Sequence, residues 1–202
     1  FSRYVIDLNR PPDDAPMYPG ASNTELCPTR FFTGDPLYKA GCEPDATEKL
    51  RRREIYWQPY HQALSGELSR LRSLHENVLL WDAHSIRGEI PWLFDGKLPD
   101  LNVGTANGLA AAESVGLAVM EVCSQQEQFT HVLNGRFKGG YITRCYGNPQ
   151  GGIHAVQLEK CQSVYMNELP PYEYKPELAA QVQPLLHKMV AAALNQVKSL
   201  SL

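Results

Sequence analysis

The feature that most constrains the fold is the apolar run NVLLWDA at residues 77–83, which turns abruptly polar at His84 and Ser85. Apart from its asparagine and Asp82, every residue in the run is apolar or aromatic. Near-continuous apolarity is typical of a strand that is buried on both faces, and such strands occur in parallel or mixed sheets under helices. The run therefore predicts a strand in the interior of a sheet.

The rest of the chain alternates between predicted strands and helices. Strands are expected where β-branched and aromatic residues cluster, and helices where apolar residues recur with a helical period. The expected strands are residues 2–8, 130–135 and 153–159, and the expected helices are residues 45–75, 109–126 and 176–197. Residues 10–44, 85–109 and 136–152 are expected to be loops. Pro59 should kink the first helix or start a second segment, and Pro184 should kink the last one. This alternation predicts the α/β class, with a mixed central sheet, flanking helices and a single domain over residues 1–202.

The composition argues against several classes of protein. The net charge is −3 and the isoelectric point is near 6.1, so a nucleic-acid partner is not expected. No apolar run approaches the length of a membrane span, and no signal peptide is visible. The five cysteines are widely spaced and lack a C-x-x-C pair, which favours reduced thiols in a cytoplasmic protein. The oligomeric state cannot be read from these features.

The first candidate site lies at the end of the run over residues 77–83. Ligands of α/β proteins bind beyond the carboxyl ends of strands, and His84 stands at such an end. Asp82 and His84 are two residues apart, so both should point to the same side of an extended strand. A carboxylate beside a metal-bound histidine fixes its orientation. The short motif alone also fits a structural histidine at a strand end, and that alternative is the commoner one.

Two further strand ends carry polar residues. Asn9 and Arg10 follow the predicted strand 2–8, and an arginine can bind a carboxylate through two parallel hydrogen bonds. The alternative is a structural ion pair for Arg10 and a turn at Asn9. Glu159 ends the apolar strand 153–159, where a glutamate can act as a general base. A solvated glutamate at a strand end is the commoner alternative.

The predicted loop 136–152 is rich in glycine and basic residues. Arg136, Lys138 and Arg144 alternate with glycines that let a backbone approach a ligand closely. Arginines in such a loop can stabilise a developing oxyanion, although a flexible basic loop is the simpler alternative. His61, on the predicted helix 45–75, is expected to be a surface or packing residue.

Five strings, taken in their order, resemble the N-formylglutamate amidohydrolase (N-formylglutamate deformylase) family from Phe1 into the last predicted helix. They are RYVIDLNRPP, LLWDAHSIR, LPDLNVGT, NGRFKGGYITRCYG and HAVQLE. The family is similar in fold to zinc carboxypeptidases and aspartoacylase, so the resemblance implies a zinc-carboxypeptidase-like mixed sheet. It also implies metal-dependent hydrolysis of N-formyl-L-glutamate, a small dicarboxylate, to formate and L-glutamate in bacterial histidine degradation.

The resemblance also implies roles for single residues. His84 is expected to bind Zn²⁺ or another divalent metal, and Glu159 to act as base and proton shuttle. Asn9 and Arg10 are expected to hold a substrate carboxylate. The arginines of the basic loop match the family less closely.

Of those arginines, Arg136 or Arg144 is expected to bind the second carboxylate or to polarise the scissile carbonyl. In the related zinc hydrolases, the first histidine and a second ligand precede the Asp-Leu-Asn-Arg motif. Phe1 opens almost directly on that motif, and a catalytic zinc takes about three protein ligands. We therefore expect the domain to lack its N-terminal segment. The alternatives are an amidohydrolase for another N-acyl amino acid and a carboxylate-binding homologue without catalytic activity.

Overall fold

The computed structural model describes residues 1–17, 20 and 22–201. Within these residues, four strands form one mixed sheet in the order β1-β4-β2-β3. The strands are β1 (Val78–Ile86), β2 (Leu101–Gly104), β3 (His131–Leu133) and β4 (Ile153–Cys161). β4 runs parallel to β1 and antiparallel to β2, and β3 runs parallel to β2. The predicted α/β class with a mixed sheet and flanking helices is confirmed.

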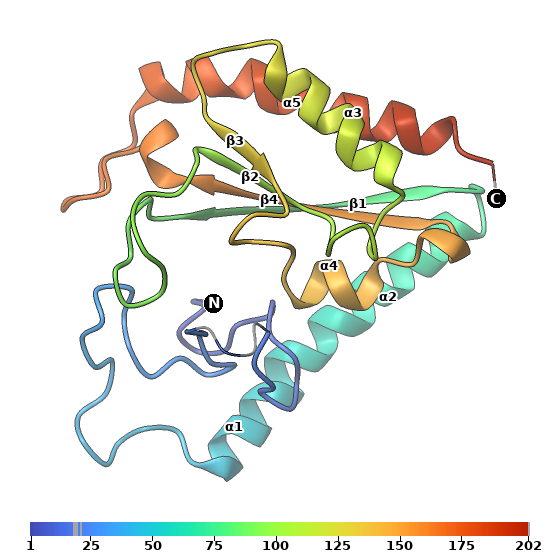
Figure 1. Ribbon diagram of the computed structural model, residues 1–202. Coiled ribbons are helices and arrows are strands. Elements are labelled where there is room, and N and C mark those ends of the chain that lie inside the picture. The colour runs from blue at the N-terminus through green and yellow to red at the C-terminus, as the bar shows by residue number, and fades with distance from the viewer. Residues whose placement is uncertain (18–19, 21, 202) are drawn as a thin grey trace.

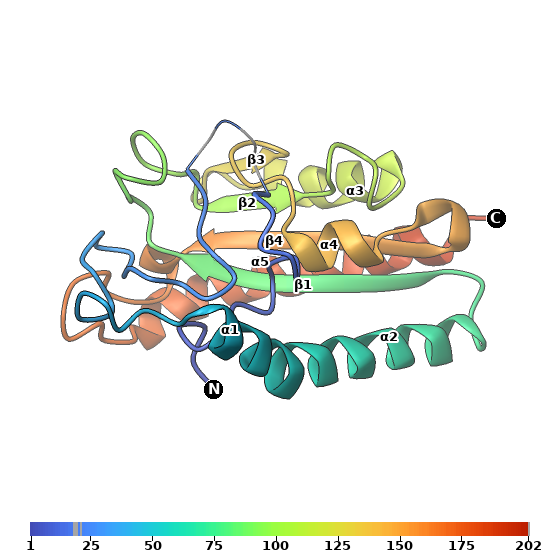
Figure 2. The ribbon, with the colours of Figure 1, turned by 90° about the horizontal axis from the view of Figure 1, so that it is seen from below.

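Helices cover both faces of the sheet, as Figure 1 shows. They are α1 (Ala46–Arg52), a π-helical turn (Arg53–Trp57), α2 (Gln58–Arg72), α3 (Glu113–Ser124), α4 (Tyr141–Tyr146) and α5 (Pro176–Lys198), with short 3-10 turns at Pro149–Gly151 and Gln162–Val164. α3 and α5 pack together on one face. α2, α4 and the N-terminal loop lie on the other face, where Figure 2 shows α2 running alongside β1. The second face is the one that carries the polar strand residues.

The alternation of side chains along β4 separates the core from the polar face. Val156 and Leu158 are buried in the main apolar cluster with Val119 of α3 and Met189 of α5. Burying a side chain of this size contributes about 1.5–3 kcal/mol. The intervening residues of β4 point to the opposite side of the sheet. The core therefore holds β4 in place while its other face remains available for chemistry.

Residues 2–8 are not a strand, so that prediction was wrong. They form turns and irregular backbone, and three carbonyl groups between Val5 and Arg10 accept hydrogen bonds from side chains of the helix that spans residues 46–72. The β-branched and aromatic pattern was real, but these residues pack in a small cluster with the helix instead of pairing with the sheet. Ile6 is the buried centre of that cluster.

Other boundaries also differ from the expectations. Residues 85–109 are not wholly irregular, because β1 extends to Ile86 and β2 lies at their end. Residues 136–152 contain α4. The first helix does change its geometry near Pro59, since the π-helical turn Arg53–Trp57 directly precedes α2 and Pro59 is the second residue of α2. α5 continues through Pro184.

Candidate active site

The register of β1 and β4 brings the polar residues of the two strands into adjacent rows. His84 lies opposite Glu159, and Asp82 lies opposite Gln157. Because residues two apart in a strand share a face, all four side chains point away from α3 and α5. Two segments that are far apart in the sequence thus supply one polar surface.

His84 is held by its neighbours on this surface. Its Nε2 lies 2.7 Å from Oδ1 of Asp82 and 3.0 Å from Nδ2 of Asn9. The carboxylate oxygen only accepts, so Nε2 carries a proton and donates it to Asp82. Nδ2 of Asn9 is also a donor, and its acceptor is Oδ2 of Asp82 at 3.4 Å. Burial lowers the pKa of His84, but the hydrogen bond and charge of Asp82 and the charge of Glu159 outweigh it and raise that pKa above its ordinary value.

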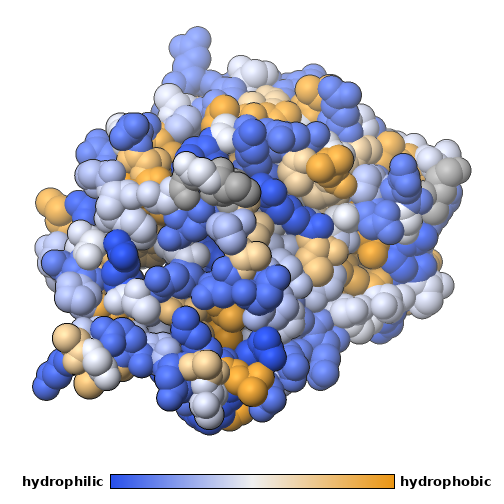
Figure 3. All heavy atoms as spheres, turned by 60° about the horizontal axis from the view of Figure 1, so that its bottom comes forward, coloured by the Kyte–Doolittle hydropathy of each residue, from blue (hydrophilic) through white to orange (hydrophobic). Residues whose placement is uncertain are grey.

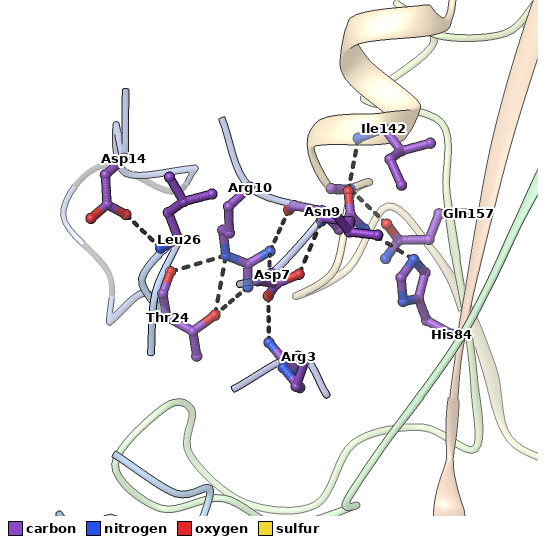
Figure 4. A network of polar contacts seen from close by, with 12 residues as sticks. Arg3, Asp7, Asn9, Arg10, Asp14, Thr24, Leu26, His84, Ile142 and Gln157 are labelled. Atoms are coloured by element: carbon purple, nitrogen blue, oxygen red, sulfur yellow. Dashed lines mark hydrogen bonds and ion pairs between the residues drawn. The ribbon is translucent and has the colours of Figure 1, made fainter. Parts of the chain in front are cut away.

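Asn9 is buried and its amide orientation is defined. Its Oδ1 accepts a hydrogen bond of 2.7 Å from the backbone N–H of Ile142, at the start of α4, so its Nδ2 points to His84. Figure 4 shows Asn9 between these two partners. Its own backbone N–H donates to the buried carboxylate of Asp7 at 3.0 Å, and Arg3 donates to the same carboxylate at 2.6 Å. Asn9 therefore joins the N-terminal loop to both the sheet and α4.

Arg10 lies next to Asn9 and lines the same cavity as His84 and Glu159. Its Nε donates to the carbonyl of Thr24 at 2.9 Å, and its Nη1 donates to the carbonyl of Asn9 at 2.6 Å. Its Nη2 also contacts the hydroxyl of Thr24. These bonds orient the guanidinium at the wall of the cavity (Figure 4).

Glu159 has the chemistry expected of an acid–base group. It is only 8% exposed, and its Oε1 has no hydrogen-bond partner among the residues that the structure describes. Burial raises its pKa to about 7, although the positive charge of His84 acts in the opposite direction. A carboxyl with a pKa near neutrality can both take and return a proton at physiological pH.

The structure separates the two arginines of the basic segment. Arg136 lines the cavity, and its Nη2 donates to the carbonyls of Ser22 and Leu93 at 3.1 and 3.2 Å. Arg144 is exposed on α4, donates to the carbonyl of Gly139 at 2.8 Å and is not among the residues that line the cavity. The cavity therefore unites five of the six predicted residues.

Sequence reasoning missed several polar residues of the cavity wall, among them Arg3, Asp7 and Gln157. Gln157 accepts a hydrogen bond of 2.6 Å from the backbone N–H of Gly140. Its spacing of two residues from Glu159 could have indicated a shared face. Asp7 is also two residues from Asn9 in the sequence, but in an irregular loop this spacing does not place two side chains on one face.

A glycine permits the close approach of α4. A Cβ added to Gly140 would lie 2.7 Å from Cγ of Asn9, which is inside the contact distance of two carbon atoms. The absence of a side chain thus allows Asn9 to reach the first turn of α4.

The described residues do not complete a metal site by themselves. They include no cluster of three or more histidine, cysteine, aspartate or glutamate side chains that is placed to hold an ion. His84 and Asp82 are adjacent, but a catalytic zinc takes about three protein ligands.

Residues 1–166 match the family model of N-formylglutamate amidohydrolase. The chain belongs to the N-formylglutamate amidohydrolase family. It is 52% identical over 194 residues to the N-formylglutamate deformylase of Pseudomonas putida, an alignment that covers 96% of this chain and 72% of that protein. It is 46% identical over 194 residues to the N-formylglutamate deformylase of Pseudomonas aeruginosa, covering 96% of this chain and 73% of the relative.

Two solved structures share the fold of this family member. The crystal structure of N-formylglutamate amidohydrolase from Ralstonia eutropha JMP134 has a TM-score of 0.79 at 22% identity, covering 99% of this chain and 76% of that one. A gene product of Agrobacterium tumefaciens has a TM-score of 0.70 at 18% identity, with coverages of 98% and 70%. At these identities the likeness shows the fold alone.

In the part of the chain that the structure describes, no helix has the length and apolarity needed to cross a membrane. The face in Figure 3, with the lower side of Figure 1 turned forward, is mainly hydrophilic, with apolar residues in small scattered groups.

Proposed function

We propose that this protein hydrolyses N-formyl-L-glutamate to formate and L-glutamate. The observation that carries the proposal is the cavity in which Glu159, poised near neutral pH, faces His84 beside Arg10 and Arg136, in a chain whose curated relatives are named for this reaction. A dicarboxylate substrate suits a wall that includes both Arg10 and Arg136, because guanidinium groups bind carboxylates with paired hydrogen bonds.

Glu159 is the proposed general base. Its carboxylate takes a proton from a water molecule, and the resulting hydroxide adds to the formyl carbon. The protonated Glu159 then gives that proton to the amide nitrogen as the C–N bond breaks, which releases formic acid and the neutral amine of glutamate. Transfer of the acid proton to that amine gives formate and an ammonium group, so atoms and charge balance. Proton transfer of this kind contributes about 10²–10⁴-fold to rate.

The remaining residues bind and orient the substrate in this proposal. Arg10, with Asn9 beside it, holds one carboxylate. Arg136 holds the second carboxylate or stabilises negative charge on the formyl oxygen. Arg144 stays a prediction for the same task, although it is not among the residues that line the cavity.

Dependence on a divalent metal, zinc in particular, is a further part of the proposal. His84 is the proposed ligand, supported by its place near the carboxyl end of β1 and by the carboxylate that orients its ring. Metal analysis by mass spectrometry tests this directly. We expect bound metal in the protein as purified, less of it after His84→Ala, and unchanged content after Glu159→Gln. Equal metal content in all three proteins would remove His84 from the metal site.

The decisive experiment measures formate released from N-formyl-L-glutamate and acetate released from N-acetyl-L-aspartate. We expect formate release to be far faster. Faster acetate release would favour an amidohydrolase for another N-acyl amino acid. Binding of N-formyl-L-glutamate without turnover would indicate a carboxylate-binding homologue. A cytoplasmic location and a place in histidine degradation remain predictions.

A further inference from the structure

We propose that Trp57 and His61 are positioning residues that set the place of Asn9 and Arg10 in the substrate site. The inference rests on the proposed function, since it assigns carboxylate binding to that pair. Neither Trp57 nor His61 lines the cavity. Both act on it through the backbone of the N-terminal loop.

The helix that spans residues 46–72 holds this loop by its carbonyl groups. Nε1 of Trp57 donates to the carbonyl of Arg10 at 3.0 Å, and Nε2 of His61 lies 3.0 Å from the carbonyl of Leu8. These two carbonyls flank Asn9 on either side. The loop has no strand partner at these positions, so the two side chains replace the hydrogen bonds that a sheet would supply.

Two more side chains of the same helix extend the attachment. Arg52 donates to the carbonyl of Val5 at 2.9 Å, and Arg53 donates to the carbonyl of Pro12 at 3.3 Å. The π-helical turn over Arg53–Trp57 lies at the centre of this set. π-helical turns are rare and occur frequently at functional sites. Four side chains along one helix thus hold four carbonyls between residues 5 and 12.

The hydrogen bonds define the tautomer of His61. A carbonyl oxygen only accepts, so Nε2 carries the proton that is donated to Leu8. Nδ1 then accepts a hydrogen bond of 2.8 Å from the hydroxyl of Tyr146. The ring is buried and stacks on Trp57 with a centroid distance of 3.8 Å. Burial lowers the pKa of His61, in agreement with a neutral ring.

Tyr146 closes the network on the other side of Asn9. It is the last residue of α4, whose first turn supplies the N–H of Ile142 that binds Oδ1 of Asn9. His61 therefore contacts both elements that hold Asn9, the loop at Leu8 and α4 at Tyr146. Such a double attachment sets the position of a side chain more closely than either contact alone.

The test compares steady-state kinetics of the full chain and its variants on N-formyl-L-glutamate. Trp57→Phe keeps a stacking ring and removes the donor to Arg10. His61→Leu removes the donor to Leu8, whereas His61→Gln keeps an N–H donor. We expect Trp57→Phe and His61→Leu each to raise KM by roughly fivefold to tenfold, the effect of one hydrogen bond, with kcat nearly unchanged.

His61→Gln should restore much of the loss caused by His61→Leu. His187→Leu is the matched control, because His187 is exposed on α5 on the opposite face, and its KM should equal that of the parent protein. Thermal melting of each variant separates folding from positioning. A lower melting temperature with an unchanged KM in Trp57→Phe and His61→Leu would show a merely structural role and overturn the inference.

Calorimetric titration with N-formyl-L-glutamate keeps this inference distinct from the proposed function. If the parent protein binds but does not turn over the compound, the proposed function fails, while weaker binding by Trp57→Phe and His61→Leu still supports the inference. Equal dissociation constants for the parent and both variants would overturn the inference alone. Neither binding nor turnover by the parent protein would overturn both.

Discussion

Replacing Glu159 with glutamine should stabilise the protein in a pH-dependent way. The side chain is buried, and its pKa is raised from 4.5 to about 7. One pKa unit corresponds to ~1.36 kcal/mol, so keeping this carboxylate ionised in the folded protein costs about 3 kcal/mol. The substitution removes the ionisable group and leaves a side chain of nearly the same shape.

The direction of the pH dependence of stability follows from proton binding. Between pH 4.5 and about 7 the folded protein binds more protons at Glu159 than the unfolded chain, so the free energy of unfolding falls as the pH rises through this range. The free energy of unfolding of Glu159→Gln does not fall in this way, because glutamine does not ionise. We therefore expect the variant and the parent to be similar at pH 4.5 and the variant to be more stable by about 3 kcal/mol above pH 7.

Urea unfolding at both ends of this pH range measures the effect. A chelator should be present, because a bound cation would change the pKa of a nearby carboxylate. Glu121→Gln serves as the control, since Glu121 is exposed on α3 and far from the polar face. A difference between Glu159→Gln and the parent that is the same at both pH values would refute the raised pKa, and with it the proposed acid–base role.

Three other predictions concern the site. The kcat/KM of the parent protein should rise with pH through about 7 as Glu159 loses its proton, and Glu159→Gln should lower kcat by about 100-fold or more; a flat profile would argue against this base. Arg136→Ala should raise KM more than Arg144→Ala, because only the first arginine lines the cavity, and equal effects on KM would contradict that placement. Gly140→Ala should displace the amide of Asn9 and weaken substrate binding, which titration with N-formyl-L-glutamate would measure. An unchanged dissociation constant would show that α4 can move away from Asn9 without weakening binding.

The local pattern of apolar residues predicted those elements in which the pattern reflects burial in the sheet. The apolar runs that precede His84 and Glu159 form β1 and β4, because a strand in the interior of a sheet needs apolar side chains whatever its sheet partners are. The same reasoning failed for residues 2–8, where a comparable pattern serves packing against a helix. It also missed β2, because four residues carry too little periodicity to be recognised between loops.

His61 shows the same limit in the site. The sequence placed it on a helix and suggested a surface or packing role. Its hydrogen bonds to Leu8 and Tyr146 come from segments 53 and 85 residues away, and no local pattern records them.

The sequence alone determined the α/β class, the two long strands and, through the order of its motifs, the identity of the polar residues. Hydrophobic periodicity and residue chemistry are local properties, so they can be read along the chain. Only the tertiary structure decided that His84 lies opposite Glu159, that Arg136 but not Arg144 reaches the cavity, and that burial raises the pKa of Glu159. Register, exposure and desolvation depend on which segments pack together, and those contacts form across distances that sequence spacing does not encode.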